Sequence, residues 1–179
     1  MLLIKNIGAI VGVREQASGA LRGDAMNHLP VLEDAWIAVD GETIHSYGPM
    51  SECPAWDAVE VVDACGEWLF PSFCDSHTHL VFAGSREKEF VDKINGLSYA
   101  EIAARGGGIL NSADRLHDYS EDRLYEEASS RVRDIIAFGT GAVEIKSGYG
   151  LNLADEIKML RVIARIRQDF PLAVKSTFL

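Results

Sequence analysis

Short runs of β-branched, aliphatic and aromatic residues, separated by polar or glycine-containing segments, fill the first 70 residues of the chain. They read "LLIKNIGAI", "AWIAVDGETIHSYG" and "AVEVVDACGEWLF". Asp40 and Gly41 divide the second run, and this dipeptide between two strand-like runs is typical of a tight hairpin. The pattern predicts a β-rich module over residues 1–70.

After Pro71 the pattern alternates between strand-like and helical periods. An apolar strand, "SFCDSHTHL", is followed by helical segments, by the strand "AVEIKSGYG", by another helix and by the strand "LAVKSTFL". Such alternation favours parallel strands joined by right-handed crossovers.

Two long helices are indicated by their ends and their apolar spacing. Ser120 is placed to cap a helix that runs to about residue 138, with acidic residues in its first turn. A second helix is expected over residues 153–169, because Pro171 stops it. The apolar face of the first helix consists of Leu124, Ala128, Val132, Ile135 and Ile136.

This order of elements is typical of a doubly wound α/β sheet or of a (β/α) barrel. Residues 71–179 supply three predicted strands, and three strands cannot close an eight-stranded barrel. The pattern therefore predicts either a small open α/β sheet or the first part of a larger protein.

Composition narrows the possible classes. The chain has 179 residues, of which 47% are hydrophobic and 25% charged, as in ordinary globular proteins. Its formal net charge of -10 makes nucleic acid a poor partner. No apolar run reaches the roughly 18 residues that a membrane helix needs, and the first residues lack the form of a secretion signal. We expect a cytoplasmic protein that binds neither nucleic acid nor membrane, with its three cysteines as free thiols.

The stretch "CDSHTHL" carries two histidines separated by one residue. On a strand, Asp75, His77 and His79 share one face, and Cα atoms two residues apart lie about 6.6 Å from each other. Both imidazoles can then reach one metal ion. A half-exposed strand end without metal is the alternative. Two ligands are fewer than the three that catalytic zinc typically takes.

The other histidines, His28, His45 and His117, fall in apparent loop or hairpin segments and are interpreted as surface residues.

Two further segments are candidates for substrate binding. In "GSREKEF", Arg86 can offer its planar fork to a substrate carboxylate, or it can form a surface pair with Glu87 or Glu89. In "EIKSGYGL", glycines flank Tyr149, which suits either a backbone close to a ligand or a plain turn between strand and helix.

Several of these stretches together resemble a known family. The segments "FCDSHTHLVFAGSREKEF", "SYAEIAARGGGIL", "GAVEIKSGYGL", "DEIKMLRV" and "STFL" occur in an order similar to the N-terminal part of the imidazolonepropionases, within the metal-dependent amidohydrolase superfamily. The resemblance implies hydrolytic opening of 4-imidazolone-5-propanoate to N-formimino-L-glutamate, a step of histidine degradation. It also implies a TIM barrel with a small β-sandwich built from both chain ends.

The resemblance assigns roles to five residues. His77 and His79 match the first two ligands of one zinc or iron ion. Arg86 and Tyr149 match residues that bind the substrate, and Tyr99 is a further candidate for the pocket. On this basis residues 1–70 are part of the sandwich, and residues 71–179 are the first three βα units of the barrel.

The sequence also departs from the family pattern. Ser72-Phe73 stands where the family usually has Gly-Phe or Gly-Leu, and "STFL" is the last segment before the family's Gly-Ala-His. The third histidine ligand and the aspartate ligand of the family lie outside these 179 residues. We therefore expect the chain by itself to be inactive or to have an alternative assembly.

Two other interpretations remain open. One is a different amidohydrolase, such as a deaminase or a cyclic-amide hydrolase, which shares the histidine pair without needing Arg86. The other is a non-catalytic metal-binding or interaction protein. For the second of these, the open edge of the third strand and an unmatched apolar barrel face favour self-association.

Overall fold

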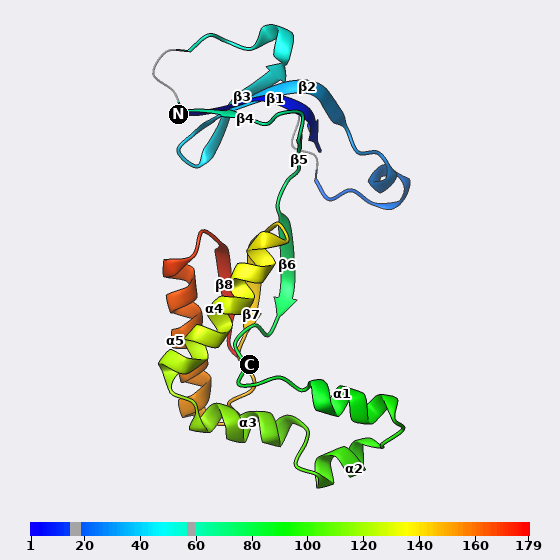
Figure 1. Ribbon diagram of the computed structural model, residues 1–179, viewed down its shortest axis with the longest axis vertical. Coiled ribbons are helices and arrows are strands. Elements are labelled where there is room, and N and C mark those ends of the chain that lie inside the picture. Colours follow the sequence, from blue (N-terminus) through cyan, green and yellow to red (C-terminus); the bar gives the residue numbers. More distant parts are fainter. Residues whose placement is uncertain (15–18, 57–59) are drawn as a thin grey trace. The chain divides into compact units, whose positions relative to one another are not determined.

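The computed structural model describes residues 1–14, 19–56 and 60–179 and divides into two compact units, Met1–Pro71 and Ser72–Leu179 (Figure 1). Each unit has hydrophobic clusters of its own.

The first unit is a five-stranded sheet in the order β3-β2-β1-β4, with β5 pairing to β1. β1 runs antiparallel to β2 and parallel to β4 and β5. The strands are β1 (Leu2–Val11), β2 (Val31–Asp40), β3 (Thr43–Pro49), β4 (Glu60–Asp63) and β5 (Trp68–Leu69), with short 3-10 helices η1 (Gly23–Asn27) and η2 (Met50–Glu52).

The predicted hairpin is confirmed. β2 pairs antiparallel with β3, Asp40 lies opposite Thr43, and Gly41 takes a φ of 56° that glycine adopts at little cost. Both faces of this sheet are apolar in its middle. Ile7 and Ile37 belong to one cluster, whereas Trp36 belongs to the other, which packs with Met50 of η2.

The second unit is a parallel three-stranded sheet in the order β6-β7-β8. Helices α4 and α5 lie over this sheet, and α1, α2 and α3 form an extension between β6 and α4 (Figure 1). The elements are β6 (Phe73–Thr78), α1 (Glu87–Ile94), α2 (Tyr99–Ala104), α3 (Ile109–Asp118), α4 (Glu121–Ala137), β7 (Thr140–Lys146), α5 (Leu153–Asp169) and β8 (Ala173–Thr177).

The two long helices are confirmed, and so is their packing. The Ser120 hydroxyl accepts a hydrogen bond from the Arg123 N–H at 3.2 Å and so caps α4. The main core lies between α4, α5 and β7, where each fully buried aliphatic side chain contributes about 1.5–3 kcal/mol. Its members include Leu124, Ala128 and Val132 of α4, Val143 and Ile145 of β7, and Met159, Val162, Ile163 and Ile166 of α5.

One prediction about local structure was wrong. His117 lies in the last turn of α3, not in a loop or hairpin. The burial of Ala113 and Leu116 on one face of α3 stabilises this helix. Its start at Gly108 has no side-chain cap, so the sequence carries no clear sign of where it begins.

The end of α3 is joined to the start of α5 by a buried carboxylate. Asp155 accepts hydrogen bonds from Asn152 Nδ2 at 2.6 Å and from His117 Nδ1 at 2.9 Å, and Lys158 Nζ lies 3.0 Å from its Oδ1. Burial acts to raise the pKa of Asp155, but these three hydrogen bonds outweigh burial and lower the pKa from 3.8 to about 2.

A carboxyl group whose pKa is lower in the folded state stabilises that state at pH values above the pKa of the unfolded state. The stabilisation is lost as the pH falls through the pKa of the folded state. We expect Asp155→Asn to lower the free energy of unfolding by about 2 kcal/mol near neutral pH. Denaturant titrations of both proteins should show this difference shrinking between about pH 4 and about pH 2. A difference that stays constant over that interval would contradict the assignment.

Candidate functional site

β6 carries the first of the two paired histidines, and its end is irregular. Asp75 pairs with Val143 and Thr78 with Ile145, so three steps along β6 face two steps along β7. A bulge of this kind redirects side chains, and it interrupts the regular alternation expected for the histidine strand. β6 ends at Thr78, so His79 follows the strand rather than lying within it.

The two imidazole rings nevertheless lie beside each other. The ring centroids of His77 and His79 are 5.7 Å apart, with an angle of 57° between the rings. This separation leaves room for one ion about 2.0–2.1 Å from a nitrogen of each ring. Asp75 does not orient either ring. It accepts a hydrogen bond from the backbone N–H of His77 at 3.2 Å.

The imidazole nitrogens of His77 and His79 are suitable metal ligands, but these two residues do not complete the coordination of an ion. Nδ1 of His79 is buried and has no hydrogen-bond partner among the described residues, and a buried imidazole nitrogen needs one. Within the same residues, no group of three or more His, Cys, Asp or Glu side chains could hold an ion. The pair is therefore suited to be part of a metal site rather than the whole of it.

Tyr149 lies against the second histidine. It belongs to the loop between β7 and α5, and the centroid of its ring is 5.2 Å from that of His79. Ser147 at the start of this loop is fully buried, and its hydroxyl accepts the Leu179 N–H at 3.1 Å. The loop is thus tied to the segment that follows β8.

Arg86 precedes α1. It forms a side-chain pair with Glu89, as in the second of the two interpretations of this residue. Its Nε and Nη2 donate to Glu89 Oε2 at 2.8 and 2.6 Å, and the other Glu89 oxygen accepts the Gly108 N–H at 3.0 Å. The hydrogen bond between the Arg86 and Glu89 side chains is the main cause that raises the pKa of Arg86, and Tyr149 and Tyr99 make smaller contributions in the same direction. The same hydrogen bond lowers the pKa of Glu89. The guanidinium is held in place but keeps 43% of its side chain exposed.

Tyr99 is the first residue of α2, where Ser98 and Glu101 form a capping box. It lines a cavity of about 350 Å³ together with Arg86. The other lining residues are Glu89, Phe90, Lys93 and Ile102. The structure therefore brings His77, His79 and Tyr149 together as one group, and Arg86 with Tyr99 as another.

Sequence reasoning missed Glu144 as a site residue. Lys146 Nζ donates to its Oε1 at 2.6 Å, and this bond is the main reason that the pKa of Glu144 is lowered, with a smaller contribution from His77. The sequence "AVEIK" contains a sign of this residue, namely charged residues that alternate with apolar ones. A middle strand of a parallel sheet is normally apolar on both faces, so the alternation of Glu144 and Lys146 with Val143 and Ile145 is a departure that gives β7 one polar face.

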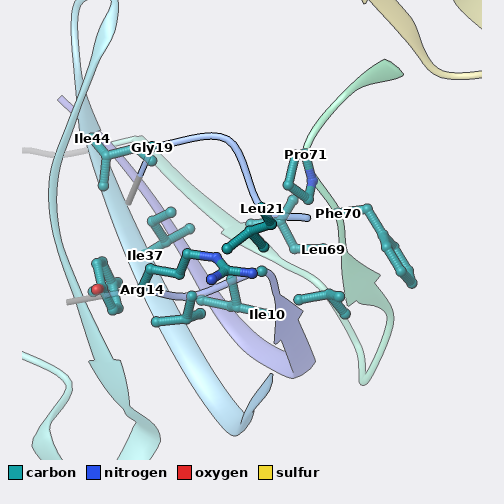
Figure 2. A pocket seen from close by; sticks show the side chains of 13 residues that line it. Ile10, Arg14, Gly19, Leu21, Ile37, Ile44, Leu69, Phe70 and Pro71 are labelled. Atoms are coloured by element: carbon teal, nitrogen blue, oxygen red, sulfur yellow. The ribbon is translucent and has the colours of Figure 1, made fainter. Parts of the chain in front are cut away.

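A cavity of about 740 Å³ lies in the first unit and contains none of the predicted site residues. Figure 2 shows Ile10, Ile37 and Leu69 around it, with Arg14 as a charged residue among its lining. Its walls are otherwise largely aliphatic and aromatic, and they continue the cluster formed by Ile7 and Ala35. The cavity is thus an uncovered part of a hydrophobic sheet face.

The chain is similar over nearly its whole length to curated imidazolonepropionases. It is 50% identical to the enzyme of Christiangramia forsetii over 178 residues, which are 99% of this chain and 43% of that protein. It is 47% identical to the enzyme of Pseudomonas aeruginosa over 149 residues, which are 83% of this chain and 37% of that protein. The chain thus spans less than half the length of these relatives. No family model matches it.

Solved structures show the same fold at much lower identity. A triazine hydrolase from Arthobacter aurescens matches with a TM-score of 0.69 and 18% identity, over 99% of this chain and 35% of that one. Guanine deaminase of E. coli matches with a TM-score of 0.54 and 12% identity, over 97% of this chain and 46% of that one. Among the described residues, no helix is long and apolar enough to cross a membrane.

The role of the histidine pair can be tested by metal binding, without turnover. We expect His77→Ala and His79→Ala each to weaken Zn²⁺ binding by the chain at least about tenfold, because each removes one of two nitrogen ligands. Isothermal titration calorimetry measures the affinity. His45→Ala, on the exposed part of β3, is the matched control and should bind as the parent does. Equal affinities in all four proteins would exclude the pair as ligands.

Proposed function

Because this chain is a homologue of the N-terminal part of imidazolonepropionase, we propose that it serves hydrolytic opening of the 4-imidazolone-5-propanoate ring to N-formimino-L-glutamate. The reaction adds water across the ring C–N bond at the carbonyl, so that the carbonyl carbon becomes a carboxylate. The released nitrogen takes up a proton and becomes the terminal nitrogen of the formimino group, which stays bonded to the product through the other ring nitrogen. Together with the similarity, the chemistry of the grouped side chains supports this proposal.

One observation of the structure carries the proposal. Tyr149 packs on His79, a candidate metal ligand, while Glu89 holds Arg86, a candidate carboxylate ligand, beside the cavity that Tyr99 also lines. A substrate that has a hydrolysable ring at one end and a carboxylate at the other matches this arrangement. The ring would lie near the histidines and the propanoate near the arginine.

Each residue then has a physical role. An ion of zinc or iron bound in part by His77 and His79 supplies Lewis-acid polarisation of the ring carbonyl. Arg86 pairs with the propanoate carboxylate through the donors that Glu89 does not occupy, while Glu89 keeps the fork oriented. Tyr149 offers a ring face and a hydroxyl, and Tyr99 lines the cavity beside the arginine.

The proposal includes the finer fold. The open sheet β6-β7-β8 is taken as the first three strands of an eight-stranded (β/α) barrel, and the first unit as part of a small sandwich. The relatives are more than twice as long as the matched region, so they have further chain to supply the remaining strands. We propose that the C-terminal strands of the sandwich, rather than barrel strands, cover the apolar cavity of the first unit. The cytoplasmic location and self-association expected from the sequence stay predictions.

A second candidate is another amidohydrolase reaction, such as deamination. It is favoured only by the fold, which the chain shares with a triazine hydrolase and a guanine deaminase. Such enzymes need no arginine for a propanoate, so the role of Arg86 separates the two candidates. The third interpretation is a non-catalytic metal-binding protein. Turnover by the metal-loaded protein would exclude this interpretation.

The test uses two substrates and a metal-loaded, active protein of the relatives' full length, in which these 179 residues form the N-terminal part. We expect Arg86→Ala to lower kcat/KM for 4-imidazolone-5-propanoate about 100-fold, because a charge-assisted pair is lost, and to change kcat/KM less than about twofold for the analogue without the carboxylate. Arg86→Lys is the matched control. It keeps the charge without the fork and should give an intermediate loss. Equal losses on both substrates would argue against the carboxylate-binding role.

A further inference from the structure

The loop that carries Tyr149 is folded around one carboxylate. Glu156, in the first turns of α5, accepts the Gly148 N–H through Oε2 at 2.6 Å. Its Oε1 accepts the N–H groups of Gly150 at 2.7 Å and Leu151 at 3.1 Å. The carboxylate therefore binds the backbone on both sides of Tyr149.

Among the residues that the structure describes, this carboxylate forms no ion pair. Glu156 is 5% exposed, and none of the ion pairs within the described residues includes it. A buried carboxylate needs compensation, and here three backbone N–H groups and the positive end of α5 provide it. Folding of the loop and burial of this charge thus depend on each other.

The backbone of the loop requires that support. Gly148 has a φ of 114° and Leu151 a φ of 54°, and the second is unfavourable for a residue with a side chain. A Cβ on Gly150 would lie 2.6 Å from the backbone nitrogen of Glu156, so the loop can approach the helix this closely only with glycine there. Without the carboxylate the conformation has little to hold it.

We propose that Glu156 is a positioning residue, which fixes the ring of Tyr149 against His79 and thereby sets where the substrate is held. The proposal rests on the proposed function for the consequence in turnover, but the positioning itself concerns this chain alone. Removing the carboxylate frees Gly148 and Gly150, and the ring between them loses its fixed distance to His79.

The first experiment measures the ring contact by NMR, without turnover. The chain has five histidines and five tyrosines, so selective labelling makes the cross-peak between the rings of His79 and Tyr149 assignable. We expect Glu156→Gln to weaken this nuclear Overhauser effect at least about twofold, because an amide cannot accept the three N–H groups as a carboxylate does. Asp155→Asn is the control, since it removes an equally buried carboxylate at the adjacent position.

Two results would overturn the proposal. One is an unchanged cross-peak in Glu156→Gln, and the other is an equal loss in Asp155→Asn, which would indicate general destabilisation. If Glu156→Gln does not fold, Glu156→Asp serves instead. Its shorter side chain cannot span Gly148 and Gly150, so a full cross-peak in that variant counts against the proposal.

The second experiment is a double-mutant cycle in kcat/KM on the metal-loaded, active protein. Glu156→Gln should lower kcat/KM about tenfold when Tyr149 is present and less than about twofold in the Tyr149→Ala background, since its effect acts through that ring. Additive losses would assign Glu156 a general structural role and overturn the proposal. Absence of turnover by a parent protein of the relatives' full length would instead count against the proposed function, while the NMR comparison still decides the positioning role.

Discussion

The parallel alignment of β6, β7 and β8 is the constraint on which the candidate site depends. Parallel strands end at the same edge of a sheet, so the histidines at the end of β6 and the loop after β7 are brought together. Hydrogen bonds beyond the strands continue this alignment, because the Ser147 N–H donates to the Thr177 carbonyl at 2.9 Å. The long helices α4 and α5 stabilise the sheet from one face and leave this edge open to chemistry.

Around that edge, carboxylates help to hold the functional segments, in addition to apolar contacts such as that of Tyr149 with the main core. Glu89 joins the Arg86 guanidinium to the backbone of Gly108, Asp155 joins α3 to α5, and Glu156 gathers the loop of Tyr149. Each has two oxygens and can bind two segments at once. This explains why an acidic chain can keep several carboxylates buried or partly buried, since each is compensated by N–H groups or by a cation.

Much of the fold follows from local pattern. The hairpin at Asp40-Gly41, the cap at Ser120 and the extent of α5 were predicted because each depends on neighbouring residues. The bulge at the end of β6 and helices α1 to α3 were not, because short helices offer few periodic positions and a bulge depends on the register of the partner strand.

In the candidate site, too, some features could be predicted from the sequence and others could not. The family resemblance is confirmed by the identity to curated imidazolonepropionases, whereas the roles of its five residues stay predictions. Sequence spacing suggested that His77 and His79 face one ion, and the rings do lie together. It gave no indication that Glu156 binds three N–H groups, because that contact exists only once the loop has folded back on the helix.

Anomalous X-ray diffraction from crystals of the metal-loaded protein tests the central claim most directly, since data at the zinc and iron absorption edges locate the ion and identify it. The account predicts one ion about 2.0–2.2 Å from a ring nitrogen of both His77 and His79, with Tyr149 packed beside the second ring. An ion bound at another place, or one in contact with neither imidazole, would contradict it.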